Sequence, residues 1–387
     1  MALRQSSFFT RFVILGVLAH VYVGLRLIPD APIDAAAASG GWLLLVLSCI
    51  FIPLGMLSRR SSSHWGPRAD QLAWIGLLVM GFFSSLFVFT LLRDAVLFLS
   101  WVASLLGVQV PLPALRSVSA LLVPALALLG SAAGFFNARR LARVVTVDVP
   151  VAGLPAALEN FTIVQISDVH VGPTIKAGYV RAIVAAVNAE RPDLIAITGD
   201  VVDGSVEHLA AHTQPLSGLH APYGVYLVTG NHEYYSGANA WVQEFRRIGL
   251  TVLMNEHVVV EPQGQRLVVA GITDYTAGSF YEDHRSNPAR ALAGAPEDAA
   301  VKLLLAHQPR SAVAAAPLGY TLQLSGHTHG GQFFPWGFFV QLQQPYTAGL
   351  HRRLGMWVYT SRGTGYWGPP KRLWAPSEIT RIRLVRA

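Results

Sequence analysis

The chain contains a single cysteine, Cys49, and few charged residues. Only 13% of its 387 residues are charged, whereas 52% are hydrophobic. One cysteine excludes disulfide bonds within the chain and a metal cluster built from thiolates. So low a charged fraction excludes an ordinary soluble globular protein. The length leaves room for two domains, and the apolar excess lies almost entirely before residue 140.

Four apolar blocks in that part of the chain predict membrane-spanning helices. Each is about 17 to 21 residues long, close to the ~20 residues that a helix needs to cross the hydrocarbon core. The stretch Ala95–Gly107 is also apolar, but Arg93 and Asp94 separate it from the third block. It is therefore either a continuation of the third helix or an interfacial helix. We predict four spans, with five as the alternative, near residues 12–28, 41–57, 72–92 and 119–138.

Arginines flank alternate ends of these blocks and indicate an orientation. They precede the first span and follow the second and fourth, at Arg4, Arg11, Arg59, Arg60, Arg68, Arg139, Arg140 and Arg143. The loop 29–40 has no Lys or Arg. By the positive-inside rule, the N-terminus and everything after residue 140 face the cytoplasm. The prediction is a multi-pass protein of the cell (inner) membrane. Because the net charge of +7 partly serves this topology, it is weak evidence for nucleic-acid binding.

A cleaved signal peptide is the competing interpretation of residues 1–38, since "DAAAASG" could be a cleavage site. The apolar core is longer than most signal peptides use, further spans follow, and no twin-arginine pair precedes it. We therefore expect the segment to remain as the first span.

After Arg143 the sequence changes to short β-branched runs that alternate with helix-like stretches. The strand-like runs are "TIVQIS", "DLIAIT", "GVYLVT", "RLVVAG", "VKLLLA", "YTLQLS", "MWVYTS" and "ITRIRLV". Such alternation predicts an α/β sheet covered by helices. We accordingly divide the chain into a membrane region, 1–145, and a second domain, 146–387.

Polar motifs follow five of these runs. They are "DVH" (Asp168, His170), "GDVVD" (Asp200, Asp203), "GNHE" (Asn231, His232), His307, and "GHTH" (His327, His329). Each has an ordinary structural explanation when taken alone, such as a helix cap, a turn residue or a core histidine. Ligands gather at the carboxyl ends of strands in sheets of this kind, and five such ends together predict a metal site.

The ligand types define the chemistry of that site. In an extended chain, residues two apart point the same way, so Asp168 and His170 could hold one ion together. Carboxylate, amide and imidazole ligands without sulfur suit Mn, Fe or Zn. The ligands exceed what one ion can hold, and Asp200 is placed to bridge two. Two bridged ions can clamp a phosphoryl group and generate hydroxide at neutral pH.

In this order, D-x-H, G-D-x-x-D, G-N-H-E, a lone H and G-H-x-H resemble the calcineurin-like metallophosphoesterase superfamily, from about Phe161 to Gln332. "GHTHGGQ" and "YTSRGTGYWGPPKRLWAPSEI" are similar to its bacterial membrane-associated branch, which includes UDP-diacylglucosamine diphosphatase-like enzymes. The resemblance implies a β-sandwich flanked by helices, rather than the doubly wound sheet that alternation alone would suggest.

The resemblance also implies a role for each residue. It assigns metal one to Asp168, His170, Asp200 and His329, and metal two to Asp200, Asn231, His307 and His327. His232 would contact the phosphate and protonate the leaving oxygen, so His232 and Asp200 are the predicted catalytic residues. Asp203 and Asp274 are candidates for supporting the ligands. Two divalent ions are expected, with Mn favoured over Fe or Zn.

The predicted function is a membrane-anchored phosphoesterase acting on a phosphodiester or pyrophosphate, lipid-linked or small. The uncharged aromatic run "FFPWGFFVQL" (Phe333–Leu342) favours an amphiphilic substrate at the bilayer. A tethered nuclease or cyclic-nucleotide phosphodiesterase is the alternative, and a non-catalytic metal-bound sensor or scaffold is a third. The nuclease and nucleic-acid partners stay open because basic residues alternate with aromatic ones at Arg352, Arg353, Arg362, Lys371 and Arg372.

Overall fold

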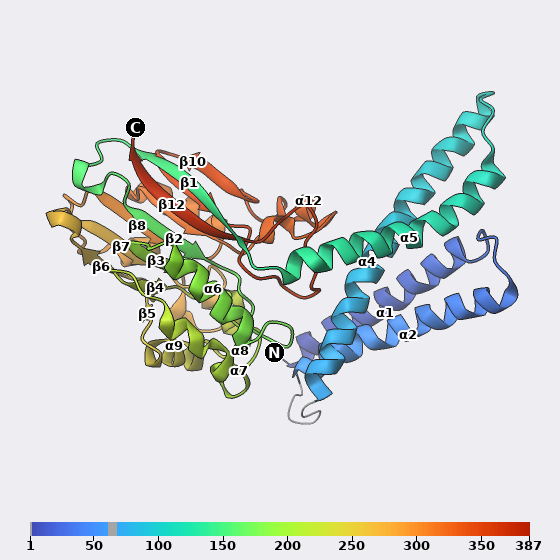
Figure 1. Cartoon of the computed structure of the whole chain (residues 1–387), viewed down its shortest axis with the longest axis horizontal. Helices are drawn as coiled ribbons and strands as arrows, with labels where there is room; N and C mark the ends of the chain where they lie inside the picture. Colours follow the sequence, from blue (N-terminus) through green and yellow to red (C-terminus); the bar gives the residue numbers. More distant parts are fainter. Residues whose placement is uncertain (1, 61–67) are drawn as a thin grey trace. The chain divides into compact units, whose positions relative to one another are not determined.

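The computed structural model describes residues 2–60 and 68–387 of the chain (Figure 1). It divides into two compact units, each described below by itself. The helical unit comprises Met1–Phe136 with Gly368–Lys371, and the sheet unit comprises Asn137–Trp367 with Arg372–Ala387. The side chains of Arg4, Arg59 and Arg60, on which the predicted orientation partly rests, lie outside the described residues.

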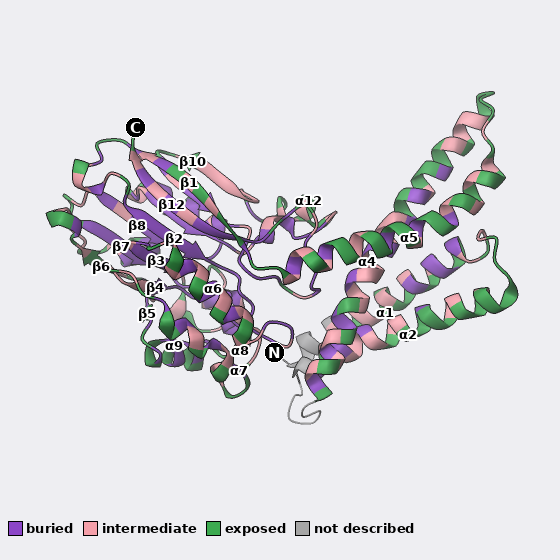
Figure 2. Cartoon of the chain, in the orientation of Figure 1, coloured by how far each residue is buried: buried purple, intermediate pink, exposed green. Residues whose placement is uncertain are grey.

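Four long apolar helices make up the helical unit. They are α1 (Ala2–Leu27), α2 (Ala35–Arg60), α4 (Arg68–Leu105) and α5 (Leu112–Arg139). Each contains a stretch long and apolar enough to cross a membrane, so the prediction of four N-terminal spans is confirmed. Many large apolar residues of these helices are exposed, among them Leu15, Leu44 and Leu129, each about two-thirds exposed. Exposed positions along the helices are green in Figure 2. Such a surface suits a hydrocarbon environment rather than water.

Helix α4 runs without a break through Arg93 and Asp94, which the sequence analysis took as a separation. The stretch after residue 94 is therefore a continuation of this helix. The guanidinium of Arg93 is buried and donates to Asp30, to Ser119 Oγ at 2.8 Å and to the carbonyl of Arg26 at 2.9 Å. Asp94 accepts two hydrogen bonds from Arg26, at 2.7 and 3.0 Å. Because neighbouring helices satisfy both charges, the helix continues past them.

Two mixed six-stranded sheets form the sheet unit. The first has the order β1 (Arg143–Val151), β12 (Glu378–Arg386), β2 (Thr162–Ile166), β3 (Leu194–Ile197), β4 (Val225–Leu227) and β5 (Thr251–Val252). The second has the order β10 (Gly349–Arg353), β11 (Met356–Thr360), β9 (Leu322–Ser325), β8 (Val301–Leu305), β7 (Leu267–Gly271) and β6 (Glu256–Val260). All eight predicted runs form strands, whereas β1, β5, β6 and β10 were missed.

Helices cover the outer faces of the two sheets. Helices α6 (Ala177–Ala189), α7 (Val206–Thr213) and α9 (Ala238–Arg247) share a core with the first sheet. Helices α10 (Pro288–Leu292) and α11 (Ala312–Ala315) share another with the second. The remaining short helices are α8 (Asn231–Ser236) and α12 (Trp336–Val340).

A third core lies between the sheets and draws on both. It contains Ile163 and Leu194 from the first sheet and Leu303 and Leu322 from the second, all fully buried. Strand β2 is buried at every position because both of its faces are covered (Figure 2). The expected β-sandwich flanked by helices, following four membrane-capable helices, is confirmed.

Candidate metal centre

The seven predicted metal ligands come together at one edge of the sandwich, from both sheets. They follow β2, β3 and β4 of the first sheet and β8 and β9 of the second. Three overlapping groups of side chains could hold a metal ion: Asp168, His170 and His329; His170, Asp200 and His232; and Asp200, His307 and His327. His170 and Asp200 each belong to two groups, so the groups form one continuous cluster.

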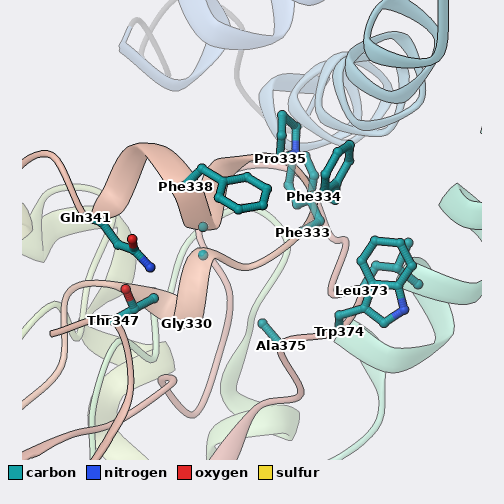
Figure 3. Close-up of a pocket in the computed structure, with 12 residues that line it drawn as sticks. Gly330, Phe333, Phe334, Pro335, Phe338, Gln341, Thr347, Leu373, Trp374 and Ala375 are labelled. Atoms are coloured by element: carbon teal, nitrogen blue, oxygen red, sulfur yellow. The ribbon is translucent and has the colours of Figure 1, made fainter. Parts of the chain in front are cut away.

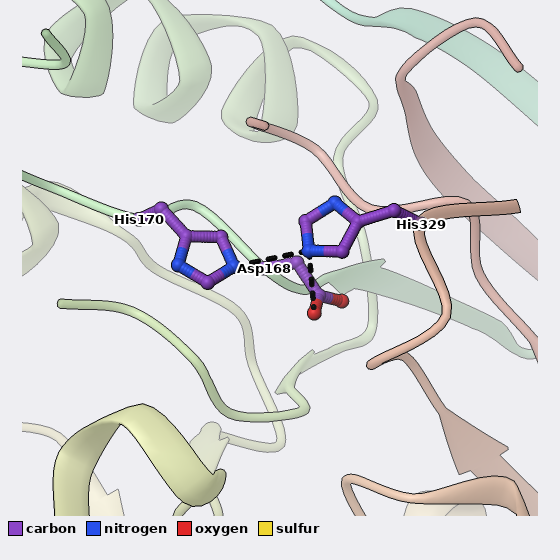
Figure 4. A group of neighbouring side chains, drawn as sticks. All are labelled: Asp168, His170 and His329. Carbon is purple, nitrogen blue, oxygen red and sulfur yellow. Dashed lines mark hydrogen bonds and ion pairs between the residues drawn. The ribbon is translucent and has the colours of Figure 1, made fainter. Parts of the chain in front are cut away.

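The first group joins the loops after β2 and β9 (Figure 4). His170 Nε2 and His329 Nε2 lie 3.0 Å apart, and Asp168 Oδ1 lies 3.4 Å from His329 Nε2. Asp200 Oδ2 is 3.9 Å from His170 Nε2. These donor atoms face a common point, which is the arrangement that a bound cation requires.

The second side of the cluster lies around His307. Its Nε2 is 3.1 Å from Asp200 Oδ2 and 3.2 Å from His327 Nδ1. Its Nδ1 faces the carbonyl of Thr198 at 2.7 Å, a contact that fixes the ring and leaves Nε2 toward the site. Asn231 Oδ1 is buried and has no hydrogen-bond partner among the described residues. An orphaned amide oxygen beside carboxylate and imidazole donors fits a divalent cation.

Five of the predicted ligands adopt left-handed backbone conformations. The φ angles are 54° at Asp168, 54° at His170, 51° at Asp200, 71° at His327 and 51° at His329. The extended-chain argument for the spacing of two was therefore wrong, because tight turns rather than strand pleats bring these side chains together. Left-handed non-glycine residues cost about 1–3 kcal/mol each and persist where the surroundings enforce them.

Two of the motif glycines permit close approach. A methyl group at Gly230 would overlap Asp200 Oδ1, and one at Gly326 would overlap Ser167 Oγ and Asp168 Oδ2. Gly199, in the motif "GDVVD", has a φ of +84° and so permits a sharp turn before Asp200. The site thus depends on glycine for space as well as for backbone freedom.

Asp203 links one predicted ligand to the predicted acid. Its Oδ1 lies 3.0 Å from Nδ1 of His170 and 2.6 Å from Nδ1 of His232. Burial opposes a charged imidazole, but the carboxylates of Asp200 and Asp203 outweigh it and raise the pKa of His232 to about 9. His232 is therefore a proton donor at neutral pH in the metal-free protein.

The ionisable groups of the cluster have pKa values that are shifted in different directions. Burial would raise the pKa of Asp200, but the charges of His307 and His232 hold it well below its ordinary value. Burial would lower the pKa of His307, yet Asp200 raises it well above its usual range. Burial and the charge of His307 lower the pKa of His327 to about 3. A metal ion that binds here must displace the proton on His307.

Glu233 is a structural part of the site that the sequence analysis quoted without a role. Its buried carboxylate accepts hydrogen bonds from the backbone N–H of Asp200 at 2.9 Å, Val201 at 2.7 Å and Gly230 at 2.6 Å. Burial, and next to it the charge of Asp200, raise the pKa of Glu233 to about 7. Glu233 therefore ties the loop after β3 to the start of α8. Its position next to the predicted site residues in the motif "GNHE" is the sequence feature from which this role could have been predicted.

Arg372 contacts a predicted ligand instead of forming part of an exposed basic surface. It is buried, and its Nη atoms lie 3.1 Å from His329 Nδ1 and 3.2 Å from the His329 carbonyl. Lys371 is also buried, and Arg362 pairs with Glu378 at 2.8 Å. The basic and aromatic tail thus does not form one exposed groove for nucleic acid. The sequence alone does not show whether an arginine such as Arg372 is buried or exposed.

Asp274 lies behind the ligands and touches none of them. Its carboxylate accepts from Gln308 Nε2, at 2.9 and 3.1 Å, and from Thr276. Gln308 follows His307 in the chain, so Asp274 is one residue removed from the predicted metal ligand. It supports the site indirectly.

An apolar cavity of about 220 Å³ lies beside Gly330 and Gly331, which follow His329 (Figure 3). The aromatic run expected to be a loop contains the short helix α12. Phe333 is buried, and three other rings of the run are about half to two-thirds exposed: Trp336 48%, Phe338 68% and Phe339 53%. Trp374, across the cavity, is 78% exposed. An exposed aromatic surface of this kind marks an interaction site.

Comparison with known proteins identifies the class. Residues 161–331 match the family described as calcineurin-like phosphoesterase. An uncharacterized metallophosphoesterase of Aquifex aeolicus is 32% identical over 245 residues, which cover 62% of this chain and 91% of that protein. The chain therefore belongs to the calcineurin-like metallophosphoesterase family, and the clustered His and Asp residues are those that could hold its divalent metal.

A second relative is described as a transmembrane protein. The "Transmembrane protein with metallophosphoesterase domain" of Danio rerio is 37% identical over 262 residues, 66% of this chain. The chain spans 60% of the length of that protein and of its Bos taurus counterpart. With its four apolar helices, the chain is a membrane protein of this family. The names of these relatives do not confirm the UDP-diacylglucosamine diphosphatase-like branch.

Proposed function

We propose that this chain is a membrane-anchored hydrolase that uses two divalent metal ions to cleave a phosphodiester or pyrophosphate. The observation that carries the proposal is the continuous cluster in which Asp200 belongs to two of the ligand groups. One carboxylate shared between two sets of imidazole and carboxylate donors is the ligand pattern of a bridged pair of ions.

In this proposal, metal one is held by Asp168, His170, Asp200 and His329, and metal two by Asp200, Asn231, His307 and His327. The two ions, when bound, neutralise the phosphoryl oxygens and activate the attacking water. Nitrogen and oxygen donors without sulfur suit Mn, with Fe or Zn as alternatives. The buried orphan oxygen of Asn231 supports its assignment as a ligand.

His232 is the general acid of the proposed reaction. It donates the proton that the leaving oxygen needs, and Asp203 at 2.6 Å fixes its ring and holds it protonated. A metal-bound scaffold would need no such acid, so the pair favours catalysis over the sensor alternative. Tyr235 and Trp367 place exposed rings at 5.2 and 5.8 Å from the His232 ring, where they could contact the leaving group.

We further propose an amphiphilic substrate, for which a UDP-diacylglucosamine-like pyrophosphate is one example. The apolar cavity lies beside Gly330 and Gly331, which follow His329, and Phe338 and Trp374 are exposed rings in its lining (Figure 3). Trp336 and Phe339, in the same aromatic run as Phe338, are also exposed. Aromatic side chains favour the headgroup level of a bilayer, and the spans keep the chain at a membrane. The proposed role of the exposed rings is to hold acyl chains while the phosphoester reaches the metals.

Hydrolysis by the purified full-length chain tests the activity. With Mn²⁺ supplied, we expect turnover of a phosphodiester or a pyrophosphate that disappears on chelation and returns with Mn²⁺. Phosphomonoesters should be the poorer substrates. Absence of metal-dependent turnover on any phosphodiester or pyrophosphate, soluble or lipid-linked, would contradict the proposal.

Replacing the exposed rings tests the substrate class. Trp336→Ser combined with Phe338→Ser and Phe339→Ser should reduce hydrolysis of a lipid pyrophosphate at least about tenfold, since each buried ring contributes about 1.5–3 kcal/mol. Hydrolysis of a small soluble ester should change little. Val259→Ser, on an edge strand of the second sheet, is the exposed apolar control. Equal losses on both substrates would instead indicate a packing role.

The proposed location of the active site is the cytoplasmic side of the inner membrane, from the arginine asymmetry. Labelling with a membrane-impermeant maleimide tests it, because Cys49 is the only native cysteine and can be replaced by serine. Gln109→Cys, exposed between α4 and α5, should react in intact cells. Ala211→Cys, exposed on α7, should react only after permeabilisation. The reverse pattern would overturn the orientation.

A further inference from the structure

Arg310 presents a guanidinium group that no described carboxylate neutralises. It lies three residues after His307, in a short helical turn that Pro309 begins. Its Nε donates to Gln308 Oε1 at 2.7 Å, and its guanidinium carbon lies 4.0 Å from the centroid of the Tyr275 ring. Among residues 2–60 and 68–387, its two Nη atoms have neither an ion-pair partner nor a hydrogen bond.

A buried polar network fixes the position of this arginine. Gln308, itself buried, donates to the fully buried carboxylate of Asp274 at 2.9 Å. Gln308 Oε1 accepts from Gln344 Nε2 at 3.0 Å as well as from Arg310. Gln344 Oε1 in turn accepts from the backbone N–H of Arg310 at 3.2 Å. Satisfied buried networks are rigid, so Arg310 is held in one orientation before any ligand arrives.

Arg310 lies close to the metal site along the chain. It sits in the turn Pro309–Ser311 that follows the proposed ligand His307. Its hydrogen-bond partner Gln308 is the direct neighbour of His307. The other arginine near the ligands, Arg372, is buried and already donates to backbone carbonyls and to His329. Among the described residues, Arg310 therefore differs from Arg372 in having donors that no protein group occupies.

We propose that Arg310 binds a second anionic group of the substrate, the phosphate next to the scissile one, so that the substrate class is a pyrophosphate. This inference rests on the proposed function. In the proposed function, two bound divalent ions would neutralise the scissile phosphate, which would leave the guanidinium fork for the neighbouring phosphate. Arginine presents two parallel donors that match phosphate, and the Tyr275 ring and Gln308 reduce the entropy that it loses on binding.

Kinetics on two soluble substrates test the assignment in the full-length, Mn²⁺-loaded protein. ADP-ribose carries a phosphate beside the scissile one, whereas bis-p-nitrophenyl phosphate does not. Arg310→Met should lower kcat/KM for ADP-ribose about 10- to 100-fold, mainly through KM, and leave the diester nearly unchanged. Arg310→Lys should recover part of the loss, because a lysine keeps the charge but not the fork. Arg266→Met, on an exposed arginine at the opposite end of β7, is the control and should change neither rate.

A binding measurement keeps the proposal separate from the proposed function. Methylenediphosphonate should bind the wild-type protein at least about tenfold more tightly than methylphosphonate in calorimetry, and Arg310→Met should abolish that preference. Metal content is measured after each titration, so that stripping of Mn²⁺ is not mistaken for binding. Equal losses on both substrates, or an unchanged preference for the diphosphonate, would overturn the role of Arg310. If the protein shows no turnover but still prefers methylenediphosphonate in a way that depends on Arg310, the proposed hydrolysis is contradicted and the role of Arg310 is supported.

Discussion

The two units of this protein both bury charged side chains, and they treat them differently. In the helical unit, buried Arg93 donates to Asp30 and to helix carbonyls, and Asp94 is paired with Arg26. In the sheet unit, Asp168, Asp200 and the histidines converge on one another, and the buried Asn231 Oδ1 has no hydrogen-bond partner among the described residues. The charges of the helical unit are thus neutralised by other residues of the protein, whereas the donor atoms clustered in the sheet unit are suited to bind a cation.

This difference separates a structural cluster from a functional one. A buried ion pair with matched partners contributes to specificity of packing and needs no ligand. Clustered acids and imidazoles with shifted pKa values, held on left-handed backbone, store free energy that ligand binding can release. Burial of a charged group therefore does not by itself indicate function. A cluster of buried ionisable groups without matched protein partners does.

The largest effect is expected from Asp200→Asn. Removing the shared carboxylate weakens both proposed ion sites, so metal content should fall and activity should drop at least about 10³-fold. Elemental analysis of the purified protein together with the hydrolysis assay measures both. Asp298→Asn, on an exposed surface carboxylate, is the control. A variant with both ions retained would show that Asp200 does not bridge them.

His232→Ala should separate catalysis from metal binding. Metal content should stay near that of wild type, whereas turnover falls about 10²–10⁴-fold, the usual contribution of a general acid. His220→Ala, on an exposed loop, serves as the matched histidine control. Loss of metal as severe as in Asp200→Asn would make His232 a ligand and refute its role as the acid.

Arg93→Met should break the balanced cluster. It leaves Asp30 without its buried partner and removes the 3.6 Å contact of Arg93 with Asp94, which keeps Arg26. The free energy of unfolding should fall by about 2 kcal/mol or more. Thermal unfolding in detergent measures the change. Arg383→Met disrupts an exposed pair with Asp148 and should leave the stability nearly unchanged, because solvent screens an exposed pair. Unaltered stability in Arg93→Met would mean that the buried cluster contributes nothing to folding.

The smallest effect is a shift in pH dependence on Asp203→Asn. The pKa of His232 is raised in the folded protein, so its acid role is present at neutral pH and lost as the pH rises through that pKa. Removing one of the two carboxylates that raise it should move the alkaline limb of kcat/KM to lower pH by about one unit. The control is the pH profile of wild type under the same metal load. An unmoved limb would show that Asp203 does not tune His232.

Local patterns in the sequence were sufficient to find the clustered His and Asp residues and most strands. Apolar blocks of helical length predicted the four spans, and short β-branched runs predicted eight strands. Strand β1 was missed because its alternating polar residues follow directly on a helix, and β5 is only two residues long. The sequence left open whether the helix continues past Arg93 and Asp94 or a separate interfacial helix begins there, and the structure shows the continuation, because neighbouring residues satisfy both charges.

The sequence by itself determined the composition of the metal site, the order of its motifs and the number of membrane helices, because each depends on residues close together in the chain. Tertiary structure alone decided what surrounds them. It buried Arg372 against His329, turned Glu233 toward the backbone of the bridging loop, and left Arg310 beside Tyr275 with free donors. These contacts join segments tens of residues apart and depend on side-chain orientation. Whether a charge meets a partner is therefore fixed only when the sheets and helices pack.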